Sequence, residues 1–150
     1  MSKLFVVLAL FASFAFAQDN PAAMQLYNKG VNLLEAGKGE AARREFQAII
    51  DKYPTSAYTK LAHEEMDKPL VASIVFKNLA PLSSKEVLKQ FELANARLMV
   101  GRAYQPDYGD QARTMLAQMM VKKKLKAKDI VITTKELPDH KLEVTVTVVK

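Results

Sequence analysis

Residues 128–148 read KDIVITTKELPDHKLEVTVTV, a pattern that predicts two β-strands joined by a turn. Apolar and polar side chains alternate strictly in its second half: Leu142, Val144, Val146 and Val148 against Glu143, Thr145 and Thr147. Such alternation predicts a strand with one face in a core and the other in water. Residues 128–137 supply the partner strand, and residues 138–141 (PDHK) supply the turn. We therefore expect a β-hairpin over this stretch.

The residues before the hairpin predict one more strand and two helices. Residues 71–77 are rich in β-branched and aromatic side chains, which favour a strand. A helix capped by Ser83 or Ser84 follows, and a second helix opens at Asp110. Residues 69–150 are therefore expected to have the order β-α-α-β-β.

Residues 18–68 show the spacing of helices instead of strands. Pro21 suits the first turn of a helix, which ends before Gly37-Lys38-Gly39. A second helix covers residues 40–52, and residues 53–56 form a turn whose Thr55 or Ser56 caps a third helix. The whole chain is therefore predicted to be α+β, with the helices first.

The helical segment resembles a tetratricopeptide repeat. Its signature positions hold Leu26, Gly30, Leu33, Ala42, Phe46, Ile49 and Pro54. The small residues stand where two antiparallel helices cross, and the large ones fill the space between them. Lys29 departs from the family pattern, which prefers a large apolar residue there. A single repeat also lacks the neighbours that such arrays need, so we expect it to pack against another part of the chain or a partner.

Residues 69–150 resemble a POTRA domain, the periplasmic module that precedes outer-membrane β-barrels of the Omp85 type. The matching words are Ile74-x-Phe76, Asn78-Leu79, Ser84-x-Glu86-Val87-Leu88, Arg97-Leu98-x-x-Gly101-x-x-Tyr104-x-Pro106, Ala112-x-x-x-Leu116 and Leu142-x-Val144-x-Val146. The family usually has a glycine in the turn at Asn78, so this word departs from the pattern. The resemblance implies a mixed three-stranded sheet in which residues 129–135 form an edge strand.

Residues 1–17 have the order of a secretory signal peptide. Lys3 precedes an apolar run over residues 4–16 that only Ser13 interrupts, and Ala15-Phe16-Ala17 is a small-x-small cleavage signature. The alternative, a membrane anchor, would need roughly 20 apolar residues. We expect cleavage after Ala17 and a periplasmic protein that associates with the outer membrane through a partner.

Charge is distributed unevenly over a chain that contains no cysteine, and therefore no disulfide or thiolate metal site. Residues 18–68 carry seven Lys/Arg and eight Asp/Glu, whereas residues 69–150 carry fourteen and eight. Much of the excess is one lysine cluster: Lys122, Lys123, Lys124, Lys126 and Lys128. The cluster predicts either a solvated face or a weak contact with anionic lipid. Nucleic acid is not expected, because no aromatic side chain is interleaved for stacking.

No motif indicates an enzyme. His63 begins the motif His63-Glu64-Glu65-Met66-Asp67, in which Asp67 stands where a zinc-protease helix has its second histidine. His140 lies alone in the predicted turn, and no phosphate-binding glycine loop occurs. We therefore expect no catalysis, no cofactor, no metal and no small-molecule substrate.

The expected activity is protein binding at two surfaces. The predicted edge strand would offer its backbone and the side chains of Ile130, Val131, Ile132 and Thr133 to an extended partner. The first helix would present an apolar stripe that forms a second binding groove: Met24, Tyr27, Val31 and Leu34. The alternative is that this stripe docks on the second segment. The leading hypothesis is an accessory or scaffold in outer-membrane protein assembly or envelope organisation, binding a barrel or its clients. The alternative is a permanent subunit of a larger envelope complex, such as secretion or surface-appendage machinery.

Overall fold

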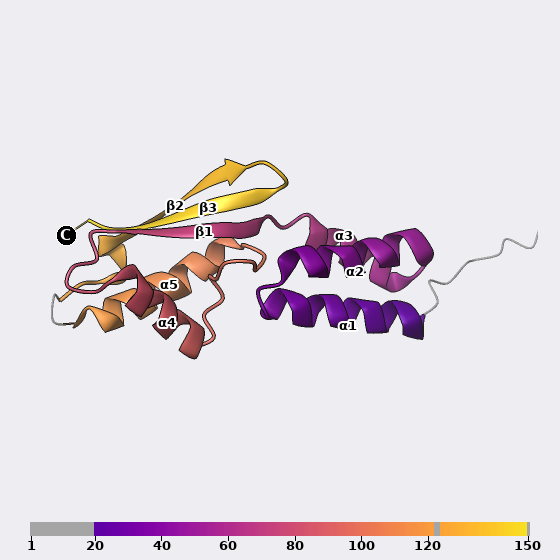
Figure 1. Ribbon diagram of the computed structural model, residues 1–150, viewed down its shortest axis with the longest axis horizontal. Helices are drawn as coiled ribbons and strands as arrows, with labels where there is room; N and C mark the ends of the chain where they lie inside the picture. Colours follow the sequence, from indigo (N-terminus) through magenta and orange to yellow (C-terminus); the bar gives the residue numbers. More distant parts are fainter. Residues whose placement is uncertain (1–19, 122–123, 150) are drawn as a thin grey trace, which may run out of the picture.

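The computed structural model describes residues 20–121 and 124–149, and within them the chain is α+β with the helices first (Figure 1). The elements are α1 (Pro21–Glu35), α2 (Gly39–Lys52), α3 (Ala57–Met66), β1 (Leu70–Lys77), α4 (Ser84–Leu93), α5 (Pro106–Met119), the 3-10 turn η2 (Ala127–Asp129), β2 (Ile130–Leu137) and β3 (Lys141–Val148). We call α1 to α3 the helical part and the remainder, from β1 onward, the β part. The predicted fold class and the β-α-α-β-β order are confirmed.

The helical part is held together by contacts between α1 and α2 and between α2 and α3. Its fully buried side chains are Ala23, Ala42, Phe46, Ile49 and Ala62. A β-carbon on Gly30 would lie 2.5 Å from the ring of Phe46, so only glycine lets the two helices approach this closely. Asn20 caps α1 and Ser56 caps α3, each by accepting a backbone N–H.

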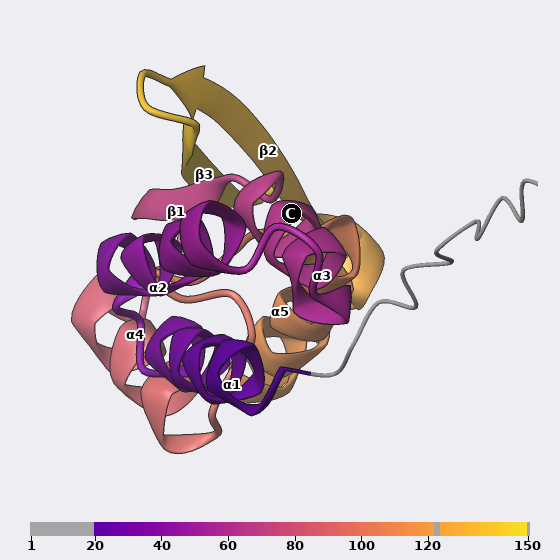
Figure 2. The same ribbon diagram turned by 90° about the vertical axis from the view of Figure 1, so that its right-hand side faces the viewer.

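The sheet has the strand order β1-β3-β2. β3 pairs in parallel with β1 and antiparallel with β2, so it lies in the centre and β2 lies at an edge. The helices α4 and α5 cover one face of this sheet, as Figures 1 and 2 show. The side chains that β3 buries against them are those the alternation predicts: Leu142, Val144, Val146 and Val148.

Several element boundaries differ from expectation. β2 begins at Ile130, because Lys128 and Asp129 belong to the 3-10 turn η2. α5 begins at Pro106, four residues before the expected start at Asp110, because proline suits the first turn of a helix. The strand β3 already starts at Lys141, which leaves residues 138–140 as the turn. Asp139 and His140 both have a positive φ there, 60° and 55°.

The helical part and the β part meet at one end of the sheet (Figure 1). The Arg43 guanidinium donates to the carbonyl oxygens of Lys68, Asp139 and His140 at 3.1–3.2 Å, which ties α2 to the start of β1 and to the tip of the β2–β3 hairpin. Gly101 has a φ of +79°, and a β-carbon there would overlap the carbonyl oxygen of Gly37. These contacts give the single predicted repeat its packing partner.

Candidate protein-binding edge

The free side of β2 is the candidate functional site, because no described strand pairs with β2 there. The amide of Val149 donates to the carbonyl of Asp129 at 2.9 Å, at the start of an unbroken antiparallel register with β3. Hydrogen-bonding groups alternate sides along a strand, so the backbone of Val131, Thr133 and Lys135 faces β3. The backbone of the even-numbered residues faces outward.

Three of these outward amides donate no hydrogen bond to any residue that the structure describes: those of Ile132, Thr134 and Glu136. The amide of Ile130 differs, because it donates to the carbonyl of Ala127 in η2. The open stretch of the edge therefore begins at Ile132. It is long enough for a short extended segment to pair with.

The four predicted contact residues of this strand divide between its two faces. Ile130 is 2% exposed and packs in the core, and Ile132 is half-buried against α5. Val131, which is 41% exposed, and Thr133 point away from the helices. A partner strand beside β2 would therefore meet Ile132 on the helix side and Val131 and Thr133 on the open side.

The structure places the predicted stripe of α1 largely against other parts of this chain. The Tyr27 ring packs against Phe46 and Tyr58, with centroids 5.8 Å and 5.6 Å apart, and burial raises the pKa of its hydroxyl. Val31 and Leu34 are half-buried, and with Tyr27 they line a cleft of about 610 Å³ whose opposite wall belongs to the β part. Only Met24, at 40% exposure, lies outside this cleft.

That cleft is polar on its β-part side. Its wall there includes Asn95, Arg97, Arg102, Gln105 and Gln111. Arg102 is already engaged, since it donates to the Ala96 carbonyl and the Asn95 amide oxygen at 2.9 Å and 2.8 Å. The stripe therefore packs mainly on the core of the helical part, and Val31 and Leu34 face the β part only across the cleft.

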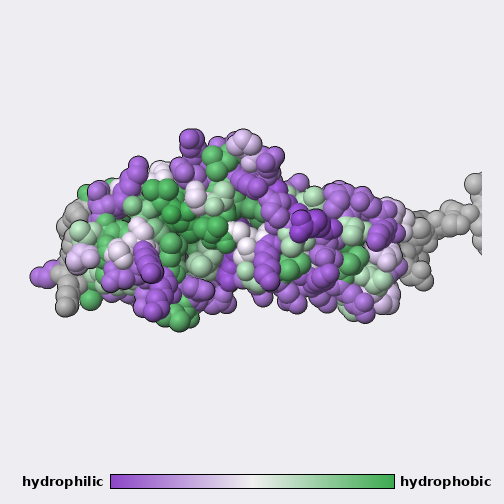
Figure 3. Space-filling view, viewed as in Figure 1, coloured by the Kyte–Doolittle hydropathy of each residue, from purple (hydrophilic) through white to green (hydrophobic). Residues whose placement is uncertain are grey.

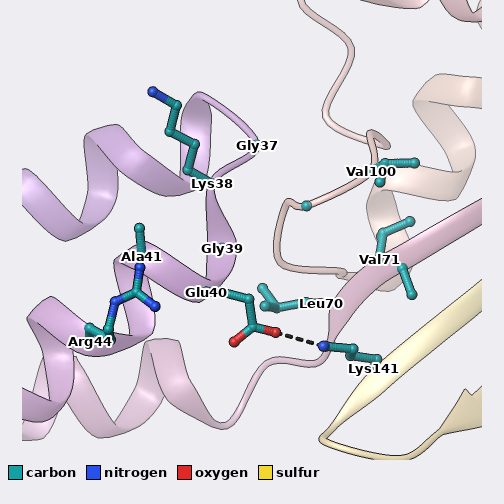
Figure 4. Close-up of a pocket in the computed structure, with 12 residues that line it drawn as sticks. Gly37, Lys38, Gly39, Glu40, Ala41, Arg44, Leu70, Val71, Val100 and Lys141 are labelled. Carbon is teal, nitrogen blue, oxygen red and sulfur yellow. Dashed lines mark ion pairs between the residues drawn. The ribbon is translucent and has the colours of Figure 1, made fainter.

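A second cavity, of about 500 Å³, lies at the junction of the two parts (Figure 4). Across it Glu40 of α2 and Lys141 of β3 form an ion pair of 2.8 Å. The hydrogen bond from Lys141 lowers the pKa of the Glu40 carboxyl, and the same contact raises the pKa of Lys141. The sequence predicted that the helical segment needs a packing partner, but it did not identify the residues that form this junction.

The histidines and carboxylates of residues 20–121 and 124–149 are dispersed over the structure. No three His, Asp or Glu side chains in these ranges are grouped to hold a metal ion. His63 is exposed on α3, whereas the His140 ring contacts the Asp67 carbonyl oxygen at 2.8 Å beside the hairpin tip. The two histidines therefore lie in separate parts of the fold, His63 in α3 and His140 in the turn between β2 and β3.

Three members of the lysine cluster, Lys124, Lys126 and Lys128, are exposed in the connection between α5 and β2. The other two, Lys122 and Lys123, lie outside the described residues, as does the predicted signal peptide of residues 1–17. None of the helices in the described ranges is long and apolar enough to cross a bilayer.

Comparisons with protein-family models, with curated proteins and with solved structures find no match for this chain. The tetratricopeptide and POTRA resemblances therefore stay predictions from the sequence.

Proposed function

We propose that this chain is an exported binding module of the bacterial cell envelope that captures an extended segment of a partner protein at the free edge of β2. The observation that carries the proposal is the run of outward backbone groups at Ile132, Thr134 and Glu136, which no described residue pairs. Each such N–H or C=O group can form a hydrogen bond with an added strand in place of its contact with water. The signal-like residues 1–17 and the POTRA resemblance support an envelope location and a role as an accessory or scaffold in outer-membrane protein assembly.

Two neighbouring threonines provide a matched test of strand addition. Thr133 and Thr134 are both exposed, but only the Thr134 amide faces outward. Thr134→Pro removes that donor without touching the core, because proline is tolerated where its missing N–H faces solvent. Thr133→Pro instead removes a hydrogen bond to β3 and is expected to destabilise the hairpin.

The experiment is cross-linked capture from an envelope extract with the wild type, Thr134→Pro and Thr134→Val as baits. The valine variant keeps the backbone amide, so it should retain whichever partner the wild type captures, while Thr134→Pro should lose it. Circular dichroism and thermal melts must show both variants folded. A folded Thr134→Pro protein that captures the same partner as strongly as the wild type would refute strand addition at this edge.

A second candidate function, a permanent subunit of a larger envelope complex, is favoured by a different observation. Figure 3 shows a broad apolar area on the β part, and the exposed apolar side chains of this part include Leu93 at 70% and Val100 at 47%. Contiguous apolar surface of this kind is typical of interaction sites. Sedimentation of the isolated protein separates the two functions, since a permanent subunit should self-associate and a module for transient clients should stay monomeric.

A further inference from the structure

The fold gathers unpaired lysines at the end of the sheet that lies farthest from the helical part. The register places Lys77 of β1 beside Thr147 of β3, and Ile130 of β2 beside Val148. Asn78 donates to the Val148 carbonyl at 3.1 Å, which closes this end of the sheet. The start of α4, the end of α5 and the connection from α5 to β2 lie at this same end of the sheet (Figure 1). We call the basic pole the following residues of these segments and of the adjoining strand ends: Lys77, Lys85, Val121, Lys124, Lys126, Lys128 and Val149.

The basic pole keeps a net positive charge, because its five lysines outnumber the two carboxylates nearest to them in sequence, Glu86 and Asp129. All five lysines are exposed, and none forms an ion pair with a carboxylate that the structure describes. The two carboxylates nearest in sequence bind backbone amides instead: Glu86 accepts from the Ser83 N–H at 2.7 Å, and Asp129 accepts from the Lys126 N–H at 2.9 Å. Hydrogen bonds from Ser83 lower the pKa of Glu86, which keeps that carboxylate in its capping role.

Two apolar side chains stand among these lysines. Val121 is 68% exposed and Val149 is 59% exposed, and both belong to segments that also carry the lysines or pair with them. Lysine ammonium groups bind lipid phosphates, while exposed valines enter the boundary between headgroups and acyl chains. An acidic polypeptide or a nucleic acid would use the lysines but would leave the valines in water.

We propose that the basic pole docks the protein on the surface of a bilayer that contains anionic phospholipid. In this orientation the sheet stands on the membrane by one end, and the helical part points away from it. The inference does not depend on strand addition at β2, because it uses other side chains and no outward backbone group.

Flotation of the exported protein after removal of residues 1–17, with phosphatidylcholine vesicles that contain or lack phosphatidylglycerol, tests the proposal. Binding is expected only to the anionic vesicles and should weaken at high salt, since ions screen charges within about 8 Å at physiological strength. The double variant Lys126→Gln with Lys128→Gln should bind about 25-fold more weakly, because each surface lysine contributes about fivefold. Lys52→Gln with Lys60→Gln, which removes the same charge from exposed positions on α2 and α3, should bind as the wild type does.

A further variant distinguishes binding to an anionic membrane from binding to a soluble anionic polymer. Val121→Ser combined with Val149→Ser should weaken binding to the anionic vesicles while leaving binding to soluble polyglutamate unchanged. The proposal is overturned if the wild type does not bind anionic vesicles at low salt, or if the two double lysine variants lose vesicle binding equally. It is also overturned if the serine variant binds vesicles like the wild type, a result that would assign the pole to an acidic polymer.

Discussion

At the scale of single residues, the sequence predicted packing best where a small residue faces a large one. Gly30 and Phe46 were expected to meet between two antiparallel helices, and in the structure the Phe46 ring occupies the space that a side chain at Gly30 would need. The ring is 1% exposed and is the largest side chain of the helical core. The stability of the helical part should therefore depend strongly on it.

Replacing Phe46 with alanine is expected to lower the free energy of unfolding by about 3–5 kcal/mol, because a large buried side chain leaves a cavity. Urea denaturation followed by circular dichroism measures the loss. Leu61→Ala on α3, where the side chain is 36% exposed, serves as the control and should cost far less. A loss below about 1 kcal/mol for Phe46→Ala would contradict the packing described for α1 and α2.

The Glu40–Lys141 pair predicts a specific pH dependence. The pKa of Glu40 is lowered from 4.5, so its contribution is present above that pH and is lost as pH falls through the lowered value. The pKa of Lys141 is raised from 10.5, so the contribution also disappears as pH rises beyond it. Melting temperatures of the wild type and Glu40→Gln should differ slightly at neutral pH and converge in acid. A gap that persists at about pH 2 would exclude this pair as the cause.

At the scale of elements, periodicity predicted the identity and order of the helices and strands, most clearly for β3, whose buried and half-buried residues alternate strictly. It failed at the start of α5, where Pro106, Asp107 and Asp110 give no apolar signal and Gln105 caps without a side-chain hydrogen bond. The edge position of β2 came from the POTRA resemblance, and the observed strand order agrees with it. Which amides of that strand face outward required the register, which alternation alone does not determine.

The cap of α4 illustrates a choice that the sequence left open. Ser83 or Ser84 could start this helix, and the structure selects Ser83, whose hydroxyl accepts from the Glu86 N–H at 3.2 Å in a reciprocal capping box. Ser83→Ala should therefore cost about 1 kcal/mol, whereas Ser84→Ala at the first helical position should be nearly neutral. Denaturant melts of the two variants compare them directly, and equal effects would contradict this assignment.

At the scale of the whole molecule, the decisive contacts join residues that are far apart in the chain. Arg43 reaches Asp139 and His140, which follow it by 96 and 97 residues. No local sequence pattern identifies the residues that Arg43 contacts. The sequence therefore predicted only that a single repeat needs another part of the molecule to pack against. The structure shows that the β part supplies it, and that Tyr27, Val31 and Leu34 face a cleft at that boundary.

Gly101 is the position where this junction can be disrupted without changing either core. Its φ of +79° strains any other residue, and a β-carbon there would overlap the Gly37 carbonyl oxygen. Gly101→Ala should therefore lower stability by about 1–3 kcal/mol and separate the helical part from the β part. Small-angle scattering should report a more extended particle, and hydrogen exchange should rise around Gly37 and at the hairpin tip.

Gly109 in α5 provides the matched control, because the same substitution there meets no obstacle. A β-carbon on Gly109 would lie 3.5 Å from the Cδ1 atom of Ile132, an ordinary packing distance. Gly109→Ala should leave the particle size unchanged and should stabilise the helix slightly, since alanine loses less backbone entropy than glycine. If the two variants scatter alike and melt alike, the close approach of Gly37 and Gly101 does not hold the two parts together, and Arg43 alone would have to do so.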